Sequence, residues 1–254
     1  MILTIDIGNT NMEFGIYHQD VLKTNFRLVT NPNITSDEIG LFVSEFFRVH
    51  RMPVEDIEDV VIASVVPQVM FSVQNAMIKY LKKKPIIIGE NIMVPMKVEC
   101  YDSVGADCLV SGYAAFLKYQ GPLVVIDFGT ATTFSVISKE GVYQGGTIFP
   151  GIKISMEALY QHTAKLPMVE LSEPNCAIGK DTVTSMQAGA IFGFVGATVY
   201  MVERLKEEMG GDAYVVATGG LSSYIQNRTD IIDRVDKTLT LDGLYYTYTS
   251  QKDS

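Results

Sequence analysis

The segment IDIGNTNMEFGIY near the start of the chain recurs in the second half as IDFGTATTFSVIS. In this alignment Asp6 and Gly8 match Asp127 and Gly129 with one constant offset. Each copy has the pattern of a strand, an Asp-x-Gly turn and a second strand, because apolar runs flank turn-forming residues. Chance agreement is the alternative, since Asp and Gly form turns in many proteins. The shared strand pattern favours an internal duplication, which predicts two similar domains facing each other across a cleft.

The rest of each half alternates strands and helices. Three short strands open the chain as a meander, and another three-strand series begins at Leu123. Thr35 and Glu38 have capping-box spacing at the start of an amphipathic helix. Apolar spacing predicts further helices at residues 69–83, 105–119, 152–166 and 182–209, and the first of these lies between the strand-like runs DVVIASVV and PIIIG. A boundary just before the Gly121-Pro122 turn gives domains 1–117 and 118–254.

Composition limits the classes of function. With 47% hydrophobic and 19% charged residues over 254 positions, the chain is globular and not disordered. Its net charge of -9 disfavours nucleic acid as the main partner. The cysteines, Cys100, Cys108 and Cys176, are scattered in the way that suits reduced cytoplasmic thiols. No basic region precedes the first strand, and the apolar stretch 186–202 is shorter than a bilayer span, so we expect neither a secretory signal nor a membrane helix.

Two turns carry groups suited to phosphoryl transfer, which needs phosphate donors, cations and a base. In Asp6-Ile7-Gly8-Asn9-Thr10-Asn11 the glycine lets backbone approach an anion, the following amides and hydroxyl donate to phosphate oxygens, and the Asp6 carboxylate orients a hydrated cation. Asp127-Phe128-Gly129-Thr130 supplies the same groups from the second half. Ala217-Thr218-Gly219-Gly220 is a third candidate, for a nucleobase or phosphate, although it also reads as an ordinary strand-to-helix turn.

Asp107 is the candidate base, because Gly105-Ala106-Asp107 lies where a loop enters a helix. Its carboxylate either caps that helix or accepts a proton from an attacking hydroxyl, and its position at a helix start favours the cap. The chain has no GxGxxG, no lysine where a P-loop requires one, and no histidine or cysteine cluster of the zinc type. Three glycines share one face of the predicted helix 182–209, where a neighbouring helix or subunit can approach closely: Gly189, Gly193 and Gly196.

Five motifs in order, DIGNTN, GAD before a helix, DFGTATTF, GGTIFPG and ATGG, make the sequence resemble the type III pantothenate kinases over nearly its whole length. That family lies within the superfamily of acetate kinase, sugar kinases, Hsp70 and actin. The resemblance implies an α/β protein with two similar ribonuclease H-like domains in the actin-like ATPase fold. It also implies transfer of the γ-phosphate of ATP to the primary hydroxyl of pantothenate, giving 4'-phosphopantothenate in the first step of coenzyme A biosynthesis.

The resemblance further implies a role for each motif. Asp107 takes the role of the general base, in preference to that of a cap. The implied ATP contacts are Asp6, Ile7, Gly8, Asn9, Thr10, Asn11, Met12, Glu13 and Thr130. The implied acceptor contacts are Gly105, Ala106, Asp107, Cys108, Tyr101 and Thr182, the last reaching the partner subunit's site in a homodimer. Mg²⁺ and a monovalent cation, K⁺ or NH4⁺, are the implied cofactors beside ATP, with Asp127 as the monovalent-cation ligand in a cytoplasmic enzyme.

The acceptor side departs from the family pattern. Family members usually read GADR where this chain reads GADC, and the Cys108 thiol lacks the forked, charged donors of arginine. Such a loss typically costs about 1.5 to 3 kcal/mol, or roughly ten- to hundredfold in affinity. Tyr101 also lies closer to the GAD motif than the family's tyrosine does. Two alternatives follow: a kinase of this architecture acting on another hydroxyl compound, and a nucleotide-binding regulatory protein without catalysis.

Overall fold

The computed structural model describes residues 1–98 and 104–252, which divide into two compact units. Among these residues, unit 1 comprises 1–96, 104–114 and 239–252, and unit 2 comprises 97–98 and 115–238. This division differs from the predicted pair of continuous domains, because the C-terminal segment from Leu239 belongs to unit 1. That segment packs against the first sheet, and sequence spacing does not reveal so long-range a contact.

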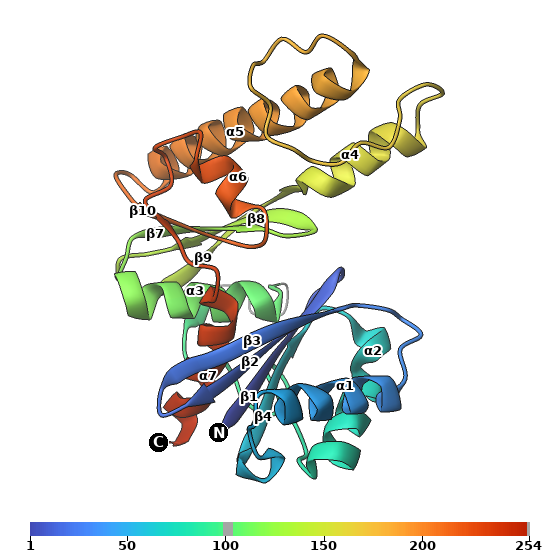
Figure 1. The fold of residues 1–254 in the computed structure, drawn as a ribbon. Helices are drawn as coiled ribbons and strands as arrows, with labels where there is room; N and C mark the ends of the chain where they lie inside the picture. The colour runs from blue at the N-terminus through green and yellow to red at the C-terminus, as the bar shows by residue number, and fades with distance from the viewer. Residues whose placement is uncertain (99–103, 253–254) are drawn as a thin grey trace. The chain divides into compact units, whose positions relative to one another are not determined.

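The two units share one sheet topology, as the internal repeat predicts (Figure 1). In unit 1 the strand order is β3-β2-β1-β4-β5, and in unit 2 the order β9-β8-β7-β10-β11 repeats it. The first three strands of each unit form an antiparallel meander, and the following strands add in parallel. Unit 1 contains β1 (Ile2–Ile7), β2 (Asn11–His18), β3 (Val21–Val29), β4 (Asp59–Ser64) and β5 (Ile86–Ile87). Unit 2 contains β7 (Leu123–Phe128), β8 (Ala131–Ile137), β9 (Val142–Pro150), β10 (Tyr214–Thr218) and β11 (Arg234–Val235), with β6 (Lys97–Val98) beside β9.

Helices cover both faces of the unit 1 sheet. On one face lie α1 (Ser36–Val49) and α2 (Pro67–Ala76), and on the other lies α7 (Leu239–Lys252) (Figure 1). The predicted capping box at the start of α1 is confirmed, because Thr35 Oγ1 accepts from the Glu38 amide at 3.2 Å and Glu38 Oε2 accepts from the Thr35 amide at 2.8 Å. The predicted helix 69–83 is α2 continued by a π-helical turn, Met77–Leu81, and a short 3-10 helix, Val54–Asp56, precedes β4.

The side chains of β1 alternate between these two faces, and this alternation positions the site. Leu3, Ile5 and Ile7 are buried in the core formed with α1 and α2. Because successive residues of a strand point to opposite faces, Thr4 and Asp6 belong to the face that α7 covers. Glu13 lies opposite Asp6 in the β1–β2 register and shares that face.

Unit 2 has its own core beneath three helices, α4 (Ile152–Gln161), α5 (Thr182–Glu208) and α6 (Ser222–Gln226). The helix predicted at 152–166 is shorter in the structure, where α4 ends at Gln161 with His162 as its C-cap. The helix α3 (Ala106–Tyr119) contributes its first residues to unit 1 and its last to unit 2.

By length and composition alone, α5 qualifies as a membrane-crossing helix, contrary to the prediction that its apolar stretch is too short. The difference arises because the helix extends beyond the stretch 186–202 at both ends. The core helix of a soluble protein passes the same test, and α5 contributes Met186, Ala190, Phe194 and Val202 to the unit 2 core.

Candidate nucleotide and acceptor site

The turn between β1 and β2 is fixed by one hydrogen bond across it and by two hydrogen bonds from Thr30. The Gly8 amide donates to the Asn11 carbonyl at 3.0 Å, and the Thr30 amide donates to the Thr10 carbonyl at 2.9 Å. The Thr30 hydroxyl also donates to the Gly8 carbonyl at 2.7 Å. Asn9, Thr10 and Asn11 are exposed, so this turn faces solvent, where a turn of this kind can meet a phosphate chain.

The other residues predicted to contact ATP differ in what they offer. Ile7 and Met12 are fully buried in the unit 1 core, so only their backbone can serve a ligand. The Glu13 carboxylate accepts from Arg27 at 2.9 Å and from Asn25 at 3.1 Å. These contacts join β2 to β3, so Glu13 helps to fix β2, the strand that follows the Gly8 turn.

The structure brings Asp107 to the same edge of the unit 1 sheet as this turn. A Cβ built on Gly105 would lie 3.6 Å from Cγ1 of Val65. The residue before α3 therefore contacts the residue that follows β4. The Val65 amide in turn donates to the Ile7 carbonyl at 3.1 Å, at the end of β1. Because β1 and β4 are parallel, their carboxyl ends share this edge, which is where α/β sheets commonly bind ligands.

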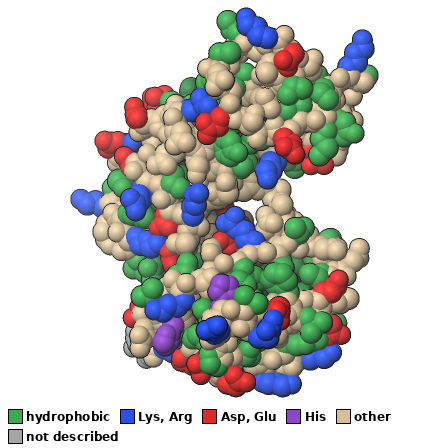
Figure 2. Space-filling view, in the orientation of Figure 1, with side chains coloured by type: hydrophobic (Ala, Val, Ile, Leu, Met, Phe, Trp, Pro, Cys, Tyr) green, Lys and Arg blue, Asp and Glu red, His purple; other side chains and the backbone are tan. Residues whose placement is uncertain are grey.

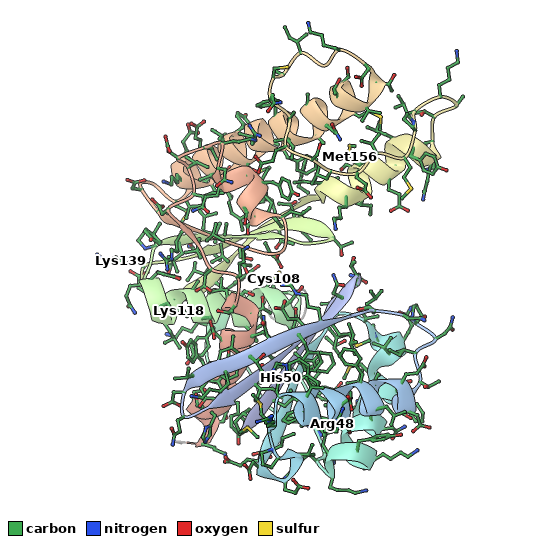
Figure 3. The ribbon with its side chains drawn as sticks, in the orientation of Figure 1. Arg48, His50, Cys108, Lys118, Lys139 and Met156 are labelled. Carbon is green, nitrogen blue, oxygen red and sulfur yellow. The ribbon has the colours of Figure 1, made fainter. Side chains whose placement is uncertain are left out.

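Asp107 lies in the first turn of α3, where its Oδ1 accepts from the Cys108 amide at 2.8 Å. The carboxylate therefore makes a local helix-start contact, and its second oxygen is the one suited to an incoming hydroxyl. Cys108 is half-buried beside it, near the start of α3 (Figure 3). Tyr101, the predicted tyrosine contact, lies outside the described residues.

Unit 2 presents a related edge around Asp127. A Cβ built on Gly219 would lie 2.4 Å from Oδ1 of Asp127 and 2.7 Å from the Phe128 amide nitrogen, so the carboxylate lies against bare backbone. Gly219 has φ +87°, a conformation that favours glycine. Thr130 is exposed in the adjoining turn, where the Gly129 amide donates to the Ala131 carbonyl at 3.1 Å. This turn closes one residue sooner than its counterpart at Gly8.

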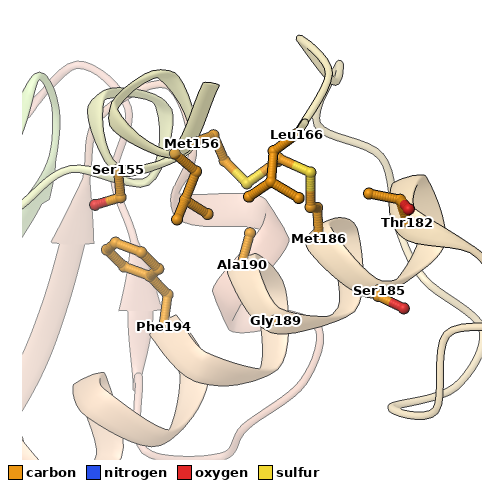
Figure 4. Close-up of a pocket in the computed structure, with 10 residues that line it drawn as sticks. Ser155, Met156, Leu166, Thr182, Ser185, Met186, Gly189, Ala190 and Phe194 are labelled. Carbon is orange, nitrogen blue, oxygen red and sulfur yellow. The ribbon is translucent and has the colours of Figure 1, made fainter. Parts of the chain in front are cut away.

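Thr182, the predicted acceptor contact, is exposed at the first position of α5 and lines a cavity of about 600 Å³ within unit 2 (Figure 4). The cavity lies between α4 and α5, and the described residues that line it are all uncharged. Met156, Leu166, Met186 and Phe194 make it mainly apolar, and Ser155 and Ser185 add hydroxyl groups (Figure 4).

Acidic residues do not gather into a metal cage in the described part of the chain. Within residues 1–98 and 104–252, no group of three or more His, Cys, Asp or Glu side chains could hold a metal ion. Asp6 lies near the carboxyl end of β1 in unit 1, and Asp127 lies near the carboxyl end of β7 in unit 2. This donor set suits Mg²⁺, which is commonly bound by one or two carboxylates together with water and substrate phosphates.

The sequence motifs do not include Thr30, and they include Gly219 only as part of a possible nucleobase or phosphate turn. Thr30 fixes the Gly8 turn from the end of β3, and Gly219 receives the Asp127 carboxylate from the end of β10. Gly219 is visible in the sequence as part of a possible turn, but its contact with Asp127 depends on the pairing of β7 with β10.

On the face shown in Figure 2, Lys and Arg side chains are interspersed with Asp and Glu.

Comparison with known proteins identifies this architecture as the actin-like ATPase fold to which sugar kinases belong. A protein of Sinorhizobium meliloti described as a 2-dehydro-3-deoxygalactonokinase matches with TM-score 0.58 and 10% identity, over 99% of each chain. A protein of Campylobacter jejuni described as a Baf family transcriptional activator matches with TM-score 0.59 and 20% identity, over 99% of this chain and 100% of that one. At these identities the two structures establish the fold alone.

The family is established by sequence. The model of the type III pantothenate kinase family matches residues 2–204. The type III pantothenate kinase of Exiguobacterium sibiricum is 45% identical over 99% of this chain and 100% of the relative. The chain therefore belongs to the type III pantothenate kinase family, as its five motifs predict.

Proposed function

We propose that this protein catalyses the ATP-dependent phosphorylation of pantothenate to 4'-phosphopantothenate, the first step of coenzyme A biosynthesis. Its family membership supports the reaction, and one structural observation supports the mechanism: α3 begins at the carboxyl edge of the unit 1 sheet, beside the Gly8 turn. A phosphate-binding turn and a carboxylate are the two groups that a hydroxyl kinase must bring to one place.

Asp107 acts as the general base in this mechanism. Its carboxylate accepts the proton of the primary hydroxyl of pantothenate as the hydroxyl oxygen forms a bond to the γ-phosphorus of ATP. The bond between that phosphorus and the β,γ-bridging oxygen breaks, and ADP leaves with the bonding electrons. The Gly8 turn stabilises the phosphates through backbone amides and the side chains of Asn9 and Thr10, while Thr130 makes the second ATP contact.

Two kinds of cation complete the proposed cofactor set. Asp6 is suited to hold Mg²⁺ through its hydration shell, since it is the next-to-last residue of β1, just before the phosphate turn. Asp127 is suited to a monovalent cation, K⁺ or NH4⁺, because its carboxylate lies at the Gly129 turn: its Oδ1 is 3.6 Å from a Cβ built on Gly129 and 2.4 Å from a Cβ built on Gly219. The chemistry that these ions supply is neutralisation of phosphate charge.

The acceptor lies against the residues 105–108 at the start of α3. Cys108 replaces a charged donor there with a neutral thiol, which weakens but does not abolish the hold on pantothenate. Tyr101 is the proposed tyrosine contact.

The protein acts as a cytoplasmic homodimer in this proposal, with Thr182 contacting the acceptor in the partner subunit's site. The exposed face of α5 supports the assignment, because a Cβ built on Gly189, Gly193 or Gly196 meets nothing within 4 Å. Tyr200, farther along the same helix, is 65% exposed. A partner helix can approach such a face closely, so Gly193→Glu should convert the dimer to monomer in sedimentation analysis. A native protein that sediments as a monomer would overturn this part.

The test of the mechanism is Asp107→Asn, with Asp212→Asn on the exposed surface as the matched control. Loss of a general base typically costs about 10²- to 10⁴-fold, so pantothenate-dependent ADP release should fall by that factor. ATP affinity, measured by calorimetry, should change less than about threefold because the Gly8 turn is untouched. Unchanged turnover in Asp107→Asn would refute the assignment of the base.

A further inference from the structure

The helix that carries Asp107 is packed against the C-terminal helix by direct backbone contact. A Cβ built on Gly243 of α7 would lie 2.0 Å from the carbonyl oxygen of Val110 and 2.5 Å from its carbonyl carbon. It would also lie 3.0 Å from Cβ of Val110, which is fully buried. Gly243 is therefore required for α3 to sit at its present distance from α7, because any side chain overlaps the α3 backbone.

A second contact between α3 and α7 fixes the position of one helix along the axis of the other. Ser111 Oγ and Thr240 Oγ1 are 2.9 Å apart and share a hydrogen bond, and Ser111 is only 4% exposed. Thr240 precedes Gly243 by one helical turn, and Ser111 follows Val110 directly. Residues three apart lie on the same face of a helix, so one face of α7 carries both contacts.

The helix α7 is itself anchored to the strands that carry the phosphate turn. Tyr17 on β2 donates to the Asp242 carboxylate, and both residues are buried. A Cβ built on Gly15 of β2 would lie 3.0 Å from Cδ1 of Leu241. At the far end of α7, Tyr248 donates to Asp59 at the start of β4. The sheet therefore fixes α7, and α7 fixes α3.

We infer that Gly243 is a positioning residue for phosphoryl transfer, acting through α3 on Asp107. Asp107 lies one turn before Val110 on α3, so a displacement at Val110 moves the carboxylate relative to the turn after β1. The inference rests on the proposed kinase function and on Asp107 as its base. It adds that the C-terminal helix sets the distance between this base and the bound phosphates.

The direct test is Gly243→Ala. Its Cβ requires α3 and α7 to separate by about 1 Å, and a misplacement of this size can cost on the order of 10²-fold in rate. We expect kcat with pantothenate to fall by about ten- to hundredfold, while KM for ATP and any ATP hydrolysis measured without acceptor stay within about twofold of the native values. Alanine favours a helix more than glycine does, so a weakened α7 cannot explain the loss.

Gly211→Ala is the matched control, because a Cβ there meets nothing within 4 Å, and its kcat should equal that of the native enzyme. A pair of milder variants covers the case in which Gly243→Ala does not fold. Thr240→Ala removes the hydrogen bond to Ser111 and should lower kcat several-fold, and Thr240→Ser keeps the hydroxyl and should restore it. A purely structural role predicts no such rescue of kcat at unchanged KM for ATP.

Retention of full kcat by a folded Gly243→Ala, or by Thr240→Ala if the former does not fold, would overturn the inference. An equal fall in pantothenate phosphorylation and acceptor-independent hydrolysis would also overturn it, since both activities then report general damage. If the native enzyme releases ADP with no phosphorylated pantothenate, the proposed function fails and this inference fails with it. If the native enzyme phosphorylates pantothenate, the proposed function stands, and the kcat of Gly243→Ala then tests the positioning role of Gly243 alone.

Discussion

Replacement of Gly219 by alanine tests the geometry of the unit 2 edge. Gly219 has φ +87°, and the added methyl group would lie 2.4 Å from Oδ1 of Asp127 and 2.7 Å from the Phe128 amide nitrogen. The left-handed conformation costs a residue with a Cβ roughly 1 to 2 kcal/mol. Overpacking against Asp127 and the β7 backbone adds about 1 to 3 kcal/mol. The total expected loss is therefore about 2 to 5 kcal/mol in the free energy of unfolding.

The control for this prediction is Gly210→Ala in the same unit. Gly210 has φ +77°, but a Cβ there meets nothing within 4 Å, so only the conformational cost of roughly 1 to 2 kcal/mol applies. Urea unfolding of both variants measures the two losses, and their difference isolates the overlap at Asp127. Because 1 kcal/mol corresponds to about 2 to 4 °C for a chain of this size, Gly219→Ala should lower Tm by about 4 to 20 °C.

The same variant should alter the response to monovalent cations. Since the Asp127 carboxylate must move to admit the methyl group, the K⁺ concentration for half-maximal activity should rise several-fold, and Gly210→Ala should leave it unchanged. Equal stability losses in the two variants would refute the reasoning about packing. An unchanged K⁺ response in Gly219→Ala would refute the assignment of Asp127 as cation ligand.

Three further changes test other parts of the structure. Burial and the Asp20 carboxylate raise the pKa of Tyr245 to about 12. The stability that this shift contributes is therefore intact below the unfolded pKa of about 10 and is lost as the pH rises toward 12. Tyr245→Phe should flatten the fall in Tm between about pH 10 and 12, and an identical slope would contradict this account. Thr30→Val removes a hydrogen bond to the Gly8 carbonyl worth about 1 kcal/mol and should raise KM for ATP roughly fivefold in initial-rate assays, with no change counting against the role of Thr30. Cys108→Arg should lower KM for pantothenate by about ten- to hundredfold, and a raised KM would show that the site has adapted to a neutral residue.

Much of the fold was predictable because its signals are local or repeated. The strand and turn pattern at Asp6 and Asp127 predicted two related sheets, and the structure shows the same strand order in both. Thr35 and Glu38 predicted the start of α1, because capping depends on neighbours three residues apart. The placement of α7 in unit 1 was not predictable, since it depends on contacts such as Tyr17 with Asp242 between opposite ends of the chain.

The local parts of the candidate site could be proposed from the sequence. The Gly8 turn and Asp107 each have a recognisable local sequence, and the family motifs add their order along the chain. Their shared location at one sheet edge depends on the parallel pairing of β1 with β4 and on the close approach of Gly105 to Val65. The role of Gly243 could not be predicted from its neighbours in sequence, because it depends on contact with the Val110 backbone of another helix.

The most direct test of the central claim is identification of the product. Purified protein is incubated with ATP labelled in its γ-phosphate, Mg²⁺, K⁺ and pantothenate, and the acceptor is analysed by mass spectrometry and phosphorus NMR. We predict label in a phosphate ester on the primary hydroxyl of pantothenate, formed in equal amount with ADP and absent with Asp107→Asn. ADP formation accompanied only by labelled inorganic phosphate, or no ADP at all, would contradict the account.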